Sequence, residues 1–303
     1  MIMSHSNSSK AIFYAFAANF AVALAKTGAA LWTGSGALMA EAIHSYADCG
    51  NQILLFVGMH RSDKQATFKH PMGFGREAYI WSMVVAFTLF SLGGLFSIYE
   101  GWMRVSEPHA LENTNIALGI LAIAVLMELV SLQGALGAMQ EEKGDRSLWQ
   151  WFRTTHSSEL MVIVGEDIAA LLGLVIALVM LGLAVYTGNS FYDALGSILI
   201  GVLLVIVAFL VGREVHSLLI GEVAEDIQQG ARQFLSAQAG VVRVLNLWAI
   251  NHGNGVMVAV KAEFKPDQSV HSAVQQINAL EKEIKRLYPR VKWVFFELDN
   301  TDE

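Results

Sequence analysis

Residues 35–58 read SGALMAEAIHSYADCGNQILLFVG, and the fold is best worked out from this stretch. It is apolar enough to lie in a membrane, yet it contains Glu41, His44, Asp48 and Asn51. His44 and Asp48 are four residues apart, so a helix places them one turn apart on the same face. Ionisable side chains are costly to bury in hydrocarbon and therefore indicate a functional site. An imidazole and a carboxylate in this arrangement predict half of a divalent-cation site.

The composition around this stretch is that of a membrane protein. Of the 303 residues, 54% are hydrophobic and only 16% are charged, and the mean hydropathy is +0.46. Long apolar runs with few charges predict transmembrane helices surrounded by membrane lipid. No basic stripe is present, so nucleic acid is not expected as a partner. Six spans are predicted, at residues 11–32, 37–59, 79–103, 115–139, 160–186 and 191–211.

Loop charges predict the orientation of these spans. The loop between the second and third spans contains four basic residues, and the loop between the fourth and fifth contains three. The connections after the first and fifth spans contain none. Because positively charged loops stay in the cytoplasm, both termini are predicted to be cytoplasmic.

From about residue 221 onward, the amino-acid composition is that of a soluble domain. Residues 223–238 and 269–288 have the pattern of amphipathic helices, whereas 241–250, 255–264 and 291–298 have that of strands. We therefore predict a transmembrane domain at 1–212 and a cytoplasmic α/β domain at 213–303.

The fifth predicted span contains the second acidic cluster, Glu166 and Asp167. Two neighbouring carboxylates in an apolar segment are not easily both ionised without a cation. We predict a metal site formed by His44, Asp48 and Asp167, completed by Glu166 or water. Glu166 points about 100° away from Asp167 on a helix, so a role in a proton path or a pairing elsewhere is the alternative. Mixed nitrogen and oxygen ligands suit zinc, iron, cobalt or manganese.

Other ionisable residues within the spans, four of which have a predicted role, are less informative. Lys26 and Glu128 are predicted to form an ion pair or to face a water-filled cavity. Asp193 is predicted to cap the sixth helix. Glu41 is predicted to lie in the entry path or behind the metal ligands.

At this point the chain resembles the cation diffusion facilitator family of metal transporters, over nearly its whole length. The matching elements are LMAEAIHSYADCGNQILL in the second span, HPMGFGRE before the third, FSLGGLFSIYEG at its end, FYDALGSILIG in the sixth and LLIGE after it. The branch it resembles most contains mitochondrial-type zinc transporters and their bacterial relatives.

The resemblance implies a six-helix transmembrane domain with a cytoplasmic αββαβ, metallochaperone-like domain, assembled as a homodimer. It implies metal/proton antiport that exports a divalent cation by alternating access, with zinc the first candidate and manganese, iron or cobalt the alternatives. A bacterial inner membrane is the expected location. No prosthetic group is expected. A metal-dependent membrane enzyme is a much weaker alternative, because no nucleophile motif accompanies the acidic residues.

The chain departs from the family pattern at two places. The fifth-helix motif is His-x-x-x-Asp, and Asp167 matches its Asp, but Ile163 stands where the His is expected. In the second-to-third loop, Phe74 replaces an additional His and leaves His70 alone. Arg76 is predicted to pair with Glu222 or Glu225.

Overall fold

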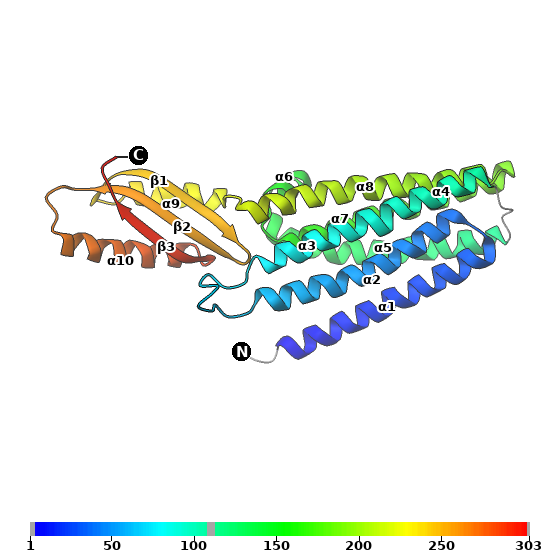
Figure 1. Cartoon of the computed structure of the whole chain (residues 1–303), viewed down its shortest axis with the longest axis horizontal. Helices are drawn as coiled ribbons and strands as arrows, with labels where there is room; N and C mark the ends of the chain where they lie inside the picture. Colours follow the sequence, from blue (N-terminus) through cyan, green and yellow to red (C-terminus); the bar gives the residue numbers. More distant parts are fainter. Residues whose placement is uncertain (1–3, 108–112, 302–303) are drawn as a thin grey trace. The chain divides into compact units, whose positions relative to one another are not determined.

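The computed structural model describes the backbone of residues 4–107 and 113–301, with side chains from residue 19 onward. Ten α-helices, one π-helical segment and three strands occur in these residues. Figure 1 labels the α-helices and the strands. In chain order they are α1 (Ser4–Thr33), α2 (Gly36–Ser62), α3 (Glu77–Thr88), η1 (Leu89–Leu95), α4 (Phe96–Ser106), α5 (Thr114–Lys143), α6 (Leu148–Thr154), α7 (Ser158–Thr187), α8 (Phe191–Ile220), α9 (Glu225–Ser236), β1 (Val241–His252), β2 (Gly255–Phe264), α10 (Val270–Leu287) and β3 (Val291–Leu298).

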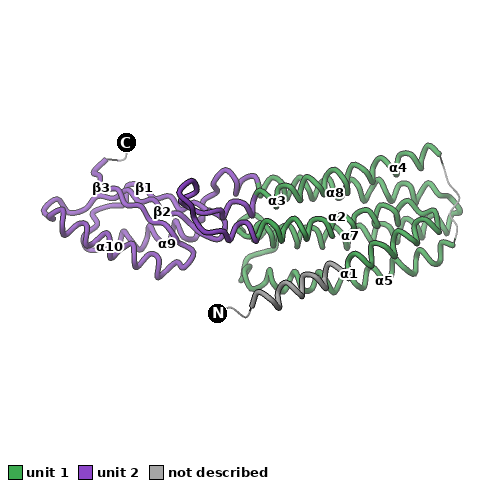
Figure 2. Tube along the Cα trace, turned by 60° about the horizontal axis from the view of Figure 1, so that its bottom comes forward, with its two compact units in different colours: residues 1–59, 80–215 green, residues 60–79, 216–303 purple. Residues whose placement is uncertain are grey.

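The chain divides into two compact units, coloured separately in Figure 2. The first contains residues 1–59 and 80–215, and the second contains 60–79 and 216–303. The loop between α2 and α3 thus belongs by its contacts to the second unit. In the sequence-based prediction this loop belongs to the transmembrane domain, which ends at residue 212. The division of the chain into a transmembrane and a cytoplasmic domain stays a prediction.

The first unit is a bundle of long helices. The segments α3–η1–α4, α5, α7 and α8 are long and apolar enough to cross a membrane. The other two predicted spans form α1 and α2, of 30 and 27 residues. In α2, the polar residues around His44 lower the hydropathy of a helix whose length is otherwise sufficient. The predicted fold class, a helical membrane domain with a small α/β domain, is confirmed.

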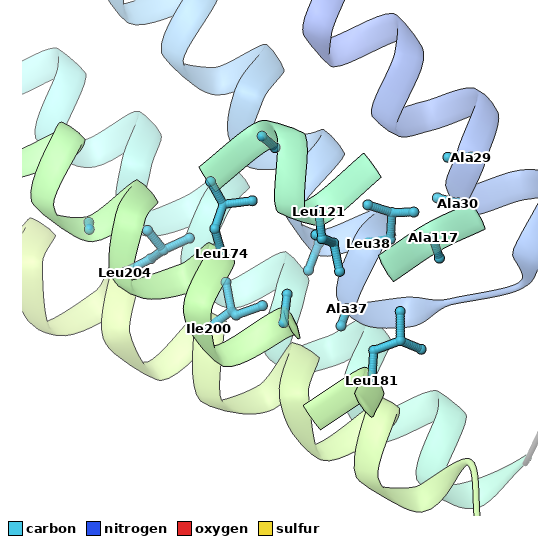
Figure 3. Packing of buried hydrophobic residues seen from close by; sticks show 14 of the residues in the cluster. Ala29, Ala30, Ala37, Leu38, Ala117, Leu121, Leu174, Leu181, Ile200 and Leu204 are labelled. Atoms are coloured by element: carbon cyan, nitrogen blue, oxygen red, sulfur yellow. The ribbon is translucent and has the colours of Figure 1, made fainter. Parts of the chain in front are cut away.

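An apolar cluster fills part of this bundle, with side chains from α1, α2, α5, α7 and α8 (Figure 3). Leu38, Leu121, Leu174 and Ile200 are fully buried in it. The cluster precedes His44 along α2 and follows Glu166 along α7, so it lies on the side of these polar residues that faces the α1–α2 turn.

The second unit has the predicted αββαβ order. Its sheet has the order β1-β2-β3, with β1 antiparallel and β3 parallel to β2. Its core contains the inward-facing strand residues Leu247, Val258 and Val260, with Leu235 from α9 and Ile284 from α10. The strongly amphipathic α9 and α10 supply these residues because their apolar positions recur at helical spacing.

Candidate metal transport site

Helix α2 presents His44 and Asp48 one turn apart, as their spacing predicts. His44 Nδ1 lies 3.5 Å from Asp48 Oδ1, and His44 is buried. Neither ring nitrogen of His44, nor Asp48 Oδ1, has a hydrogen-bond partner among the described residues. Buried polar atoms without such partners are rare in folded proteins. Imidazole nitrogen and carboxylate oxygen are donors that transition metals use, so these atoms fit a cation site.

Helix α7 contributes Glu166 and Asp167, and the two carboxylates are held differently. Glu166 Oε1 accepts a hydrogen bond of 2.5 Å from Asn51 Nδ2 on α2. Asp167 Oδ2 accepts one of 3.3 Å from Ser131 Oγ on α5. Glu166 is buried, whereas Asp167 is partly exposed. A short bond from a buried amide already occupies one oxygen of Glu166, which leaves Asp167 the more available ligand.

The ligand candidates on α2 and α7 are neighbours, but they do not form a single coordination site. Asp48 and Asp167 interact electrostatically. In residues 4–107 and 113–301, however, no three His, Cys, Asp or Glu side chains are placed to hold one metal ion. The arrangement therefore brings together the predicted residues as two adjacent halves, and binding a cation at both would require the two helices to adjust.

Glu128 on α5 is a further acidic neighbour, which the sequence interpretation assigned to another role. It interacts electrostatically with Asp167 and Asp48. Its position in the middle of an apolar span is the feature of the sequence that could have indicated a place near the metal site. The two α7 carboxylates accept hydrogen bonds from Asn51 and Ser131. The sequence indicates a role at the site less clearly for these two residues, because neutral polar residues in spans commonly form interhelical hydrogen bonds.

The predicted partner of Lys26 was wrong. Lys26 Nζ lies 3.4 Å from Glu41 Oε2 and donates a hydrogen bond of 2.9 Å to Ser45 Oγ. The two-residue turn between α1 and α2 makes these helices a hairpin, which brings Lys26 to Glu41. Glu41 is consequently buried in an ion pair and does not lie in an open entry path.

The predicted role of Asp193 was also wrong. Its Oδ1 accepts a hydrogen bond of 2.6 Å from Ser35 Oγ, and its Oδ2 one of 2.6 Å from Gly36 N. Asp193 therefore caps the beginning of α2 rather than its own helix, because the first backbone N–H groups of α2 lack partners within that helix.

The remaining residues singled out in the sequence are not among the predicted ligands. Ile163 is 38% exposed on the bundle surface. Cys49, the single cysteine of the chain, directly follows Asp48 on α2, and its thiol is free and buried. In the second unit, the rings of His70 and Phe74 are 4.6 Å apart. Arg76 Nε has no hydrogen-bond partner among the described residues, and the pairing with Glu222 or Glu225 stays a prediction.

Comparison with known proteins places the chain among transporters. The cation efflux transmembrane domain family matches residues 12–220. The chain is 32% identical over 257 residues to the proton-coupled zinc antiporter SLC30A9, mitochondrial, of Mus musculus, covering 84% of this chain and 44% of that protein. It is 34% identical over 227 residues to metal tolerance protein C4 of Arabidopsis thaliana, covering 73% and 49%.

A third relative matches at nearly full length. The chain is 23% identical over 285 residues to magnetosome protein MamB of Magnetospirillum gryphiswaldense, covering 93% of this chain and 90% of that protein. By contrast, the chain spans somewhat less than half the length of the zinc antiporter and the metal tolerance protein.

Proposed function

Because the chain belongs to the cation efflux, or cation diffusion facilitator, family of metal transporters, we propose that it exports a divalent metal cation in exchange for protons. It is an integral, multi-pass membrane protein of a transporter family, not an enzyme. The observation that carries the proposal is the His44–Asp48 pair in an apolar bundle: His44 is buried, and neither its ring nitrogens nor Asp48 Oδ1 has a hydrogen-bond partner among the described residues.

Zinc is the cation that we propose first. The relatives with 32% and 34% identity include a protein named as a zinc antiporter. One imidazole with carboxylates is compatible with zinc, and also with manganese, iron or cobalt. His44, Asp48 and Asp167 are the proposed ligands, and Glu166 supports the site through Asn51 or relays a proton.

The proposed cycle begins with a cation entering from the cytoplasm, in a homodimer with both termini on the cytoplasmic side of a bacterial inner membrane. His44 and the carboxylates release protons to bind it, since metal ligands must be deprotonated. The apolar cluster between these residues and the α1–α2 turn closes one route. Helix movement opens that route, and protons from the other side then displace the cation.

Proteoliposomes with an internal metal-sensitive dye test this function. We expect wild-type protein to transport zinc faster than manganese, iron or cobalt. We expect transport to fall to the background of empty liposomes in a variant with both His44→Ala and Asp48→Ala. Arg286→Ala on α10 is a suitable control, because its partner Glu283 lies on the same exposed helix face. Unchanged transport in the double variant would exclude the proposed site.

A further inference from the structure

A buried ion pair lies beside the proposed transport site without belonging to its ligands. Lys26 is 4% exposed and Glu41 is 0% exposed. Their charged atoms, Nζ and Oε2, are 3.4 Å apart. Removing two charges from water is costly before their attraction is counted, and an apolar pair of similar size is often as stable. Stability alone is therefore a weak explanation for this pair.

Both charges act on the proposed site. Lys26 Nζ also donates to Ser45 Oγ, and Ser45 directly follows His44 on α2. The positive charge of Lys26 acts on His44, Asp48 and Glu128. The negative charge of Glu41 acts on His44 and Glu128 with the opposite sign. A cation between these groups would thus be repelled by one member of the pair and attracted by the other.

The surrounding helices hold the pair in place. Glu41 Oε1 faces Gly173 on α7, where an added Cβ would lie only 2.6 Å from that oxygen. Lys26 is fixed from α1 by its two contacts on α2. Because the two charged ends are confined, their electrostatic effect at His44 and Asp48 is a fixed property of the bundle rather than an average over mobile side chains.

We propose that Lys26 and Glu41 are positioning residues whose balanced charges set the affinity of the site for its divalent cation. This inference rests on the proposed function. A transported ion must bind strongly enough to enter and weakly enough to leave. Glu41 alone would hold the cation too strongly, and Lys26 alone would repel it. Together they add little net charge.

Neutral variants of each residue test the proposal through zinc affinity. A fixed charge close to a bound cation changes the binding of that cation strongly, because little water screens the interaction inside the bundle. We expect Lys26→Met to lower the half-saturating zinc concentration by about tenfold or more, and Glu41→Gln to raise it similarly. The variant with both changes should lie within about threefold of wild type, because the two effects cancel.

The direction of each shift separates this role from a purely structural one. If the pair only held α1 against α2, both single variants would lose maximal rate or folded protein, and neither would shift the half-saturating concentration in the stated direction. That result would overturn the proposal. The direction in which each single variant shifts the half-saturating zinc concentration tests the proposal by itself. If one variant cannot be expressed as folded protein, the other still decides. Lys26→Arg keeps the charge and should retain wild-type affinity within about threefold.

Two controls distinguish failure of this inference from failure of the proposed function. Lys261→Met removes a lysine that pairs with Asp299 at 2.9 Å in the second unit, and it should leave zinc affinity unchanged. If wild-type protein transports no metal, the proposed function fails. If wild-type protein transports zinc and loses it on changing His44 and Asp48, but the Lys26 and Glu41 variants do not shift in opposite directions, only the present inference fails.

Discussion

At the residue scale, the proposed chemistry depends on which donor atoms already have hydrogen-bond partners. The ring nitrogens of His44 have none among the described residues. One oxygen of Glu166 accepts from Asn51 at 2.5 Å, whereas the bond from Ser131 to Asp167 is longer, at 3.3 Å. Adjacent carboxylates on one helix thus have unequal surroundings, and we assign them different roles.

This difference predicts unequal effects for two conservative variants. Asp167→Asn should reduce zinc transport to the liposome background, because it removes the charged oxygen of a proposed ligand. Glu166→Gln should keep measurable transport, since the amide oxygen of Gln can still accept from Asn51. Initial rates of zinc uptake check this at matched protein content. Equal loss in both variants would show that Glu166 is as essential as Asp167.

The sequence indicates these residues as candidates for the site, but it does not indicate which of them pair. His44, Asp48, Glu166 and Asp167 are recognisable because ionisable groups are rare in apolar spans. The partner of a buried charge depends instead on helix rotation and depth, which hydropathy does not encode. Lys26 was accordingly matched with the wrong carboxylate.

At the scale of single elements, the beginning of α2 is fixed by two other helices. Asp193 on α8 accepts hydrogen bonds from Ser35 and Gly36. Arg104 on α4 donates to Gly34 O and pairs with Glu100 at 2.9 Å. Because α2 carries His44 and Asp48, this clamp at the α1–α2 turn also positions the first half of the proposed site.

Asp193→Ala should therefore destabilise the protein. It leaves the amide of Gly36 and the hydroxyl of Ser35 buried without this acceptor, at a cost of about 1–3 kcal/mol each. Thermal unfolding in detergent, followed by intrinsic tryptophan fluorescence, measures the loss. Ser35→Ala removes the bond to Asp193 and also the bond that Ser35 Oγ accepts from Leu38 N, so it should destabilise the protein as well. An unfolding midpoint equal to that of wild type for Asp193→Ala would contradict the clamp.

The third predicted span is correct in extent but contains a feature that its apolar pattern does not reveal. It runs as α3, the π-helical segment η1 and α4. Within it, Gly94 approaches α8 so closely that a Cβ added at Gly201 would lie 2.7 Å from Gly94 O. Small residues allow such approach between membrane helices. The π-helical segment lies in a uniformly apolar span and does not change its hydropathy, so hydropathy could not predict it.

Gly201→Val should separate η1 from α8 and cost about 1–3 kcal/mol of stability, as overpacking typically does. Gly182→Val is the matched control on α7, because among the described residues no atom beyond the adjoining backbone of its own helix lies within 4 Å of the Cβ position there. Unfolding midpoints of the two variants in the same detergent compare the two sites. A larger loss in the control would contradict the close helix contact.

At the scale of the whole molecule, the αββαβ domain and the helical membrane domain could be predicted, because alternation and long apolar runs are strong signals. The sequence did not predict that residues 60–79 join residues 216–303 in one unit. Contacts of a polar loop depend on individual close approaches, such as the hydrogen bond from Tyr79 Oη to Gly253 O. The periodic patterns of the sequence do not predict such contacts.

His252 makes the stability of this second unit dependent on pH. Its ring lies edge-on to Trp293, with centroids 5.4 Å apart. Burial, followed by the charges of Arg76 and Lys292, lowers the pKa of His252 below its ordinary value of 6.5. The unfolded chain therefore binds more protons than the native one below pH 6.5, and this contribution to stability is lost as pH falls.

Replacing this histidine should reduce that pH dependence. Between pH 7.5 and 5.5, the unfolding midpoint of the second unit should fall less in His252→Gln than in wild-type protein. His271→Gln changes an exposed histidine on α10 and should behave as wild type. Hydrogen exchange of the β1 and β2 amides in the full-length protein follows this unit specifically. Identical pH dependence in His252→Gln and wild type would refute the assignment.

The central claim is that one site couples metal export to proton movement. Its most direct test records zinc and pH simultaneously inside proteoliposomes after an external zinc pulse. We predict zinc entry with proton exit in wild-type protein, and loss of both fluxes when His44 and Asp48 are changed to alanine. Zinc entry without proton movement, or both fluxes persisting in that double variant, would contradict the account.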